Sequence, residues 1–344
     1  MELPAALPPA MGNAKADDQE AALLGFSLFF DARLSAGQDT RCATCHLPER
    51  VFADGRQASM GVEQVDRNSP SIFTAAWHRW QTWDGKADSL WSQPLLAIEN
   101  PREMGLTRLE LAHRVATSYA DRYQAVFGSL PYGLSGWPAK GKPGDPSFDQ
   151  LGPSDQLEVN RIAANVGKSL EAYMRRDAHQ RGRFDDFVAG AATLTPSEQQ
   201  GLSVFFQAGC SSCHSGPTFS DDAFHAIGVP PNEGKQPESA RATALTALTR
   251  SVFTVTGPFH DGPAMPTNPV ASASDEGAYR TPSLRNTTRT GPWGHNGHFS
   301  DLNAMIDFHS TKVLSATEHE DLMAFLKVLD VNDPPSPWNN WPDR

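Results

Sequence analysis

The chain has 344 residues, an apolar fraction of 39% and a formal net charge of −11. This length is enough for two domains, and the charge argues against nucleic acid or an anionic membrane surface as a partner. Because no apolar run approaches the roughly 20 residues that span a bilayer, we expect no membrane insertion. The 27 glycines and 27 prolines predict long loops between a modest number of helices.

Helix signals predict a mainly α fold. A capping box at residues 107–110 begins a helix expected to run to about Phe127, and residues 159–188 are also predicted to be helical. Two more capping boxes begin helices at residues 195–198 and 315–318, the second ending near Leu329. Alternating strand patterns are scarce. Residues 128–153 and 229–277 are predicted to be long loops.

The cysteines carry the clearest chemical signal. All four lie in two Cys-x-x-Cys-His motifs: Cys42, Cys45 and His46, then Cys210, Cys213 and His214. This motif is typical of c-type haem attachment, in which both thiols bind the porphyrin and the histidine lies under the iron. Two disulfides, a four-cysteine zinc site or a thioredoxin-like dithiol would not need a histidine after each pair. The sequence therefore predicts two covalent c-type haems.

The two motifs stand in similar surroundings. Residues 25–30 resemble residues 201–206 before the motifs, and residues 51–54 resemble 218–221 after them. We expect two cytochrome c-like haem domains with long loops, an N-terminal domain at 18–164 and a C-terminal domain at 165–330, with a tail at 331–344. Residues 1–13 lack the basic start and apolar middle of a leader. Because c-type haem is attached outside the cytoplasm, we expect a mature periplasmic protein whose leader has been removed.

Further blocks make the chain resemble the bacterial di-haem cytochrome c peroxidase and MauG family over nearly its whole length. They are residues 68–70, 83–104 and 280–297. The resemblance implies that the N-terminal haem reacts with hydrogen peroxide. It implies that Glu103 lies over this haem and transfers a proton, while Gln93 hydrogen-bonds a bound oxygen. From the residues alone, a solvated carboxylate at a helix start is the favoured interpretation of Glu103. The resemblance also makes 18–164 the peroxidatic domain and 165–330 the electron-transfer domain.

The resemblance also assigns residues between the two haems. Trp83 would lie there and carry electrons, although a core tryptophan is an alternative in so aromatic a region. Asn68 and the backbone carbonyls of Thr290 and Pro292 would bind Ca²⁺, an ion that favours oxygen ligands.

Two departures from the family pattern bear on the subtype. Between His46 and Trp77 there is no histidine that could block the first iron, and Met60, the only soft donor in that loop, is more typical of a surface residue. We therefore expect an open or water-bound first haem at rest, as in MauG-like enzymes. The sixth ligand of the second haem falls at His309, where relatives have Met or Tyr. Alternative ligands are Met305, His295 and His298, and a helix-terminal histidine bound to the last carbonyls is the structural alternative for His309.

Together these features favour an enzyme in which the two haems share oxidising equivalents as a bis-Fe(IV) state and oxidise Trp or Tyr side chains of a partner protein. Ala208 stands where MauG-like enzymes have an electron-entry tryptophan. The chain is also similar to enzymes of methanobactin gene clusters, which oxidise a partner tryptophan to kynurenine. The alternatives are a peroxidase that takes electrons from a small cytochrome or cupredoxin, and a plain electron carrier.

Covalent attachment gives the first test. Acid–acetone extraction of the denatured protein should leave the haem on the chain, because thioethers survive unfolding. A pyridine haemochrome spectrum should then give two c-type haems per chain. Release of the haem into the acetone phase would contradict the assignment of Cys42, Cys45, Cys210 and Cys213.

Overall fold

A computed structural model describes residues 3–4, 6–177, 181–263 and 265–331. It confirms a mainly helical fold. The α-helices are α1 Gln19–Phe29, α2 Cys42–Cys45, α3 Gln93–Glu99, α4 Arg108–Ser118, α5 Ala120–Phe127, α6 Pro146–Asp149, α7 Pro153–Asp177, α8 Arg183–Val188, α9 Pro196–Gln207, α10 Ala240–Leu248, α11 Leu302–His309 and α12 Ala316–Val328. Short 3₁₀ turns cover Ala32–Leu34, Pro48–Arg50, Ala75–Trp77, Leu134–Gly136, Cys210–Ser212, Ala273–Asp275 and Thr287–Arg289. Strands β1 Phe224–His225 and β2 Tyr279–Arg280 pair antiparallel.

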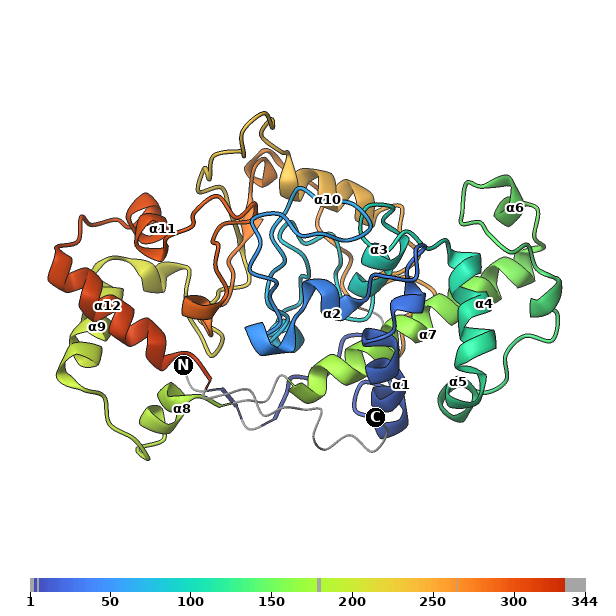
Figure 1. The fold of residues 1–344 in the computed structure, drawn as a ribbon, viewed down its shortest axis with the longest axis horizontal. Coiled ribbons are helices and arrows are strands. Elements are labelled where there is room, and N and C mark those ends of the chain that lie inside the picture. Colours follow the sequence, from blue (N-terminus) through green and yellow to red (C-terminus); the bar gives the residue numbers. More distant parts are fainter. Residues whose placement is uncertain (1–2, 5, 178–180, 264, 332–344) are drawn as a thin grey trace.

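The helices gather at two ends of the molecule (Figure 1). Helices α1, α4, α5 and α7 form one end, and α8, α9, α11 and α12 form the other. Between them lie the helices α2, α3 and α10 and long irregular segments drawn from both halves of the sequence. Loops and a few short helices, rather than the long helices, therefore build the middle of the molecule.

None of the described helices is both long and apolar enough to cross a membrane.

The internal repeat is visible in how each half packs. Helix α1 packs on α7, and α9 packs on α12 in the same way. A Cβ at Gly25 would lie 1.9 Å from the carbonyl oxygen of Ser169, and one at Gly201 would lie 1.9 Å from that of Asp321. Each repeat therefore places a glycine where two helix backbones touch, because any side chain would force them apart.

Aromatic packing repeats as well. Phe29 lies 5.1 Å from Tyr173 between ring centroids, and Phe205 lies 5.5 Å from Phe325. Each half has its own hydrophobic core, the first centred on α1 and α7 and the second on α9 and α12. The sequence repeat therefore corresponds to two packing units of the same design.

Several predicted elements need correction. The helix expected from residue 107 to Phe127 is two helices, α4 and α5, which separate at Tyr119, where the backbone leaves helical geometry. The Tyr119 hydroxyl donates to Asp31, which holds this buried ring in place. The expected loop at 229–277 contains α10. The capping boxes of α4, α9 and α12 form as predicted.

The expected boundary between residues 164 and 165 falls inside α7. The later part of this helix, including Leu170 and Tyr173, belongs to the same core as α1. A cut there would divide one core, so we propose that the two units separate after α7. The expected tail begins at Val331, which is buried with Val51 and Phe73. The rest of the tail, 332–344, lies outside the described residues.

Candidate functional site

Each Cys-x-x-Cys-His motif lies beside a cavity. The first cavity, of about 1140 Å³, is lined by Cys45 and His46 and by three predicted residues, Trp83, Gln93 and Glu103. The second, of about 390 Å³, has Cys210, Cys213, His214 and His309 in its lining. Cys42 is partly buried at the start of α2, against the first core. The structure therefore brings the predicted groups of each site together.

The motif histidines are held in the same way in both halves. His46 Nδ1 lies 3.1 Å from the carbonyl oxygen of Phe52, and His214 Nδ1 lies 3.0 Å from that of Phe219. Both phenylalanines have left-handed backbone angles, with φ of 62° and 53°. Donation from Nδ1–H fixes the tautomer and leaves Nε2 with its lone pair for a metal. Both imidazoles are therefore oriented as iron ligands.

The cysteines fit haem attachment better than the competing chemistries. All four are free of disulfides. Burial raises the pKa of the Cys42 and Cys45 thiols to about 12 and also raises that of Cys210. A redox-active dithiol needs the opposite, a thiol whose pKa is lowered. Together with the oriented histidines and a cavity beside each motif, these thiols fit two c-type haems.

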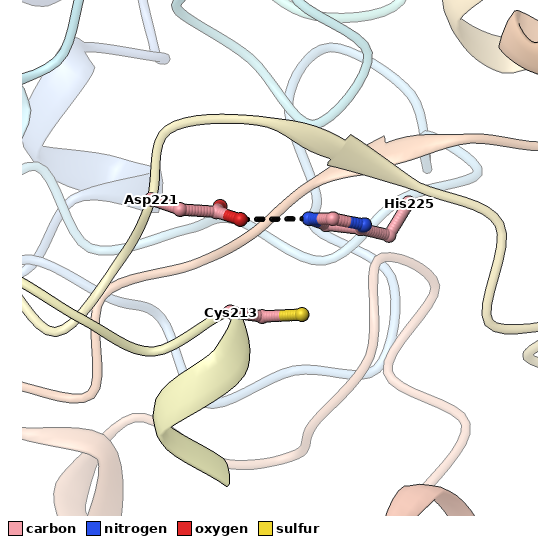
Figure 2. A group of neighbouring side chains, drawn as sticks. All are labelled: Cys213, Asp221 and His225. Carbon is pink, nitrogen blue, oxygen red and sulfur yellow. Dashed lines mark hydrogen bonds and ion pairs between the residues drawn. The ribbon is translucent and has the colours of Figure 1, made fainter. Parts of the chain in front are cut away.

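One cluster beside the second motif resembles a metal site. Figure 2 shows Asp221 and His225 facing each other, with a 2.8 Å contact between carboxylate and Nε2, and Cys213 beside them. The haem thioether requires the Cys213 sulfur, which leaves only two ligands. We therefore assign the Asp221–His225 pair to the surroundings of the second haem and not to a separate metal ion.

His309 lies across the second cavity from His214. Their ring centroids are 6.4 Å apart, with planes inclined by 66°. An ion bound to two imidazole nitrogens at roughly 2.0–2.1 Å each separates the centroids by about 6 Å. His309 Nδ1 lies 2.6 Å from the carbonyl oxygen of Met305, one of the last carbonyls of α11. This hydrogen bond occupies Nδ1 and leaves Nε2 available to a metal.

The alternative ligands are placed differently. Met305 lines the same cavity but packs against the second core. His295 stacks on Tyr279, with centroids 3.6 Å apart, and His298 lies against the ring of Phe299. The geometry therefore favours His309 as the sixth ligand.

Glu103 is a half-buried carboxyl in the first cavity. Its Oε1 accepts a 2.7 Å hydrogen bond from Asn100 Nδ2, and burial raises the pKa of the carboxyl. This environment differs from that of a solvated carboxylate at a helix start. Gln93, the first residue of α3, lines the same cavity.

The loop after the first motif, residues 47–77, contains no histidine, so it offers no imidazole to the first cavity. Met60 is 41% exposed, as expected for a surface methionine. His78 lines the cavity, but Nδ1 lies 3.0 Å from Asp222 and Nε2 lies 3.2 Å from Thr74. Because both of its nitrogens are engaged, His78 is a poor candidate for an iron ligand.

The two cavities share a wall. It contains residues 68–71, Trp83, residues 228–229, residues 279–280 and His295. Trp83 is fixed at two points, because its indole N–H donates to the Asn68 carbonyl at 2.9 Å and its own carbonyl accepts from the Arg280 N–H at 2.8 Å. A rigid aromatic ring therefore borders both sites.

The predicted calcium ligands border the second cavity. Asn68, Thr290 and Pro292 all line the second cavity, as a shared ligand set would require. The Asn68 amide N–H donates to the Arg56 carbonyl at 2.7 Å, which leaves its oxygen for another group.

Sequence reasoning missed part of the shared wall. Tyr279 stacks on His295, and Arg67 pairs with the buried Asp84 at 2.7 Å while lying over the Tyr279 ring. Arg280, also on this wall, belongs to a block noted for its resemblance but given no role. Nothing in the local sequence shows that these side chains meet, since they come from distant segments.

Two cavities with a common wall, each bearing an oriented c-type haem motif, define the chain as a di-haem c-type cytochrome. The family model "Di-haem cytochrome c peroxidase" matches residues 19–193. The chain belongs to this family, which includes MauG, and is accordingly a haem oxidoreductase with two haems that uses peroxide.

Individual relatives agree along most of the chain. The methylamine utilization protein MauG of Methylophilus methylotrophus is 29% identical over 331 residues, covering 90% of this chain and 82% of that protein. The cytochrome-c peroxidase IdrP2 of Pseudomonas sp. (strain SCT) is 30% identical over 358 residues, covering 95% and 87%. A crystal structure of a MauG-like protein associated with microbial copper homeostasis is 26% identical, with a TM-score of 0.70 and 99% of both chains covered.

The position of His309 yields a specific test. In His309→Ala, the second iron should lose its sixth ligand, so its low-spin ferric electron paramagnetic resonance signal should become high-spin. The first haem should still bind small ligands. Met305→Leu is the matched control on the same face of α11 and should keep the low-spin signal. Survival of that signal in His309→Ala would assign the ligand elsewhere.

Proposed function

We propose that this enzyme uses hydrogen peroxide to oxidise Trp or Tyr side chains of a partner protein, with both haems sharing the oxidising equivalents. The observation that carries the proposal is the position of Trp83 on the wall between the two cavities, fixed at its indole N–H and its carbonyl. When bound, the haems supply the redox chemistry, accepting two oxidising equivalents from peroxide. The residues around them decide where those equivalents go.

Proton transfer is assigned to Glu103. The carboxylate would take a proton from the peroxide oxygen nearer the haem and return it to the farther oxygen. The O–O bond would then break and the farther oxygen would leave as water, while the nearer oxygen and both oxidising equivalents would stay with the haem. A carboxyl whose pKa is raised by burial suits this exchange, because its two protonation states lie closer in free energy near neutral pH. Gln93 would orient the bound oxygen through its amide.

The first site is proposed to react without prior reduction. The loop after His46 provides no histidine, and the nearby His78 has both nitrogens engaged. Peroxide would therefore meet a haem that is held by His46 and is not blocked by a histidine of this loop. A peroxidase activated by reduction would need a blocking ligand here.

The second site is proposed to store one equivalent. Two imidazoles, from His214 and His309, stabilise oxidised iron better than an imidazole and a thioether. Trp83 would connect the sites, and sharing the charge would extend the lifetime of the oxidised pair, as a slowly docking protein substrate requires. We further propose that the protein acts in the periplasm and that Asn68, Thr290 and Pro292 bind Ca²⁺.

The copper-associated relative suggests which partner to test first. That MauG-like protein is associated with microbial copper homeostasis, so a partner protein encoded with copper-handling genes is the first substrate to mix with this enzyme and peroxide. Mass spectrometry of the partner should show oxygen added at Trp or Tyr. The second candidate, a peroxidase fed by a small cytochrome or cupredoxin, is favoured by the similarity to IdrP2. It predicts rapid oxidation of a reduced carrier and no change in the partner's mass.

Glu103→Gln should slow formation of the oxidised pair by about 10²-fold or more, because the amide cannot exchange the proton. Stopped-flow absorbance after addition of peroxide gives the rate. Glu63→Gln, at an exposed position that lines neither cavity, is the control and should react at the wild-type rate. A wild-type rate in Glu103→Gln would make Glu103 a structural carboxylate only.

Trp83→Phe should leave peroxide binding at the first haem intact but prevent oxidation of the second haem, because benzene is much harder to oxidise than indole. Rapid-freeze electron paramagnetic resonance reports the second haem through its low-spin signal. Trp80→Phe is the control, since Trp80 lies nearby but lines neither cavity. Oxidation of both haems at the wild-type rate in Trp83→Phe would exclude the relay.

A further inference from the structure

Arg280 is a buried cation that faces both cavities. It lies in β2, opposite Phe224 in β1, and lines each of the two sites. Its side chain is 11% exposed. Within the part of the chain that the structure describes, its buried Nε has no hydrogen-bond partner. A guanidinium placed in this way needs an anion, because an uncompensated buried charge is costly.

The nearest carboxylate compensates Arg280 only weakly. Asp222 Oδ1 lies 3.5 Å from the Arg280 guanidinium. The same carboxylate also contacts His78 Nδ1 at 3.0 Å and accepts from the Arg79 backbone N–H at 2.9 Å. Burial lowers the pKa of both Arg280 and His78, and the positive charge of Arg280 lowers the pKa of His78 further.

Arg67 provides a contrast on the first cavity. Its guanidinium pairs with Asp84 at 2.7 Å and also with Glu238. Two carboxylates from the protein therefore match that cation. Among the described residues, the one carboxylate paired with Arg280 is the shared Asp222, and Nη1 also lies 3.4 Å from the carbonyl oxygen of Thr281. The unpartnered Nε belongs to a side chain in the common wall, so the missing anion should come from the occupants of the cavities.

We propose that Arg280 binds a propionate carboxylate from each haem and acts as a counter-ion shared by the two sites. The planar guanidinium offers several N–H donors in a fixed fork that matches carboxylates. Its backbone N–H bonds the carbonyl of Trp83, and both residues line both cavities. The proposal rests on the two haems of the family and would stand if the protein-substrate proposal failed.

A shared positive charge has a measurable consequence at both irons. It disfavours the ferric state, which carries one more positive charge than the ferrous state. Removing this charge in Arg280→Gln should lower the equilibrium constant for reduction of each haem by about tenfold. For a one-electron couple, this corresponds to a reduction potential lower by about 59 mV. Spectroelectrochemical titration of the di-haem protein measures both values without any turnover.

Matched variants separate charge from structure. Arg280→Lys keeps the charge and should hold both constants within about threefold of wild type. Arg79→Gln is the control, because Arg79 also has a buried, unpaired Nε but lines neither cavity. It should change the constants by about twofold or less. If Arg280→Gln leaves both constants unchanged, or shifts only one haem, the shared counter-ion is excluded.

Asp222→Asn tests the same cluster from the other side and serves if Arg280→Gln fails to assemble. Asparagine matches aspartate in size and tolerates the left-handed backbone at this position, where φ is 54°. Removing this negative charge strengthens the field of Arg280, so both reduction constants should rise. Unchanged or lowered constants in Asp222→Asn would overturn the proposal.

Discussion

The hydrogen bond from each motif histidine to a phenylalanine carbonyl is the interaction on which both sites depend. His46 bonds Phe52 and His214 bonds Phe219, and each phenylalanine turns its carbonyl back through a left-handed backbone. This bond fixes the tautomer and direction of the imidazole, and so the position of the iron over each cavity. The same phenylalanine ring contacts the helix before the motif, Phe29 in one half and Phe205 in the other.

The common wall explains how two similar units produce one site. Helices form the two ends, so loops from both halves meet in the middle (Figure 1). Trp83 and Arg280 come from opposite halves of the sequence and are joined by a backbone hydrogen bond. An aromatic residue and a buried cation thus both line the wall between the cavities. In our account the first carries electrons between the haems and the second sets the potential of both.

Sequence reasoning succeeded where the cause is local. The haem motifs, the capping boxes and the glycine-aromatic repeat before each motif follow from residues a few positions apart. It failed where the cause is distant. The domain boundary fell inside α7 because periodicity cannot show which core a helix joins, and α10 lay in a segment whose composition suggested a loop. The roles of Arg280 and His78 depend on their contacts with Asp222, which lies far from both in sequence.

The central claim is that the two haems react with peroxide as one unit across Trp83. One equivalent of hydrogen peroxide added to the all-ferric protein, followed by rapid freezing, tests it most directly. The account predicts that the high-spin signal of the first haem and the low-spin signal of the second are lost together and to the same extent. Persistence of the full low-spin signal, with an organic radical in place of the second oxidised haem, would contradict it.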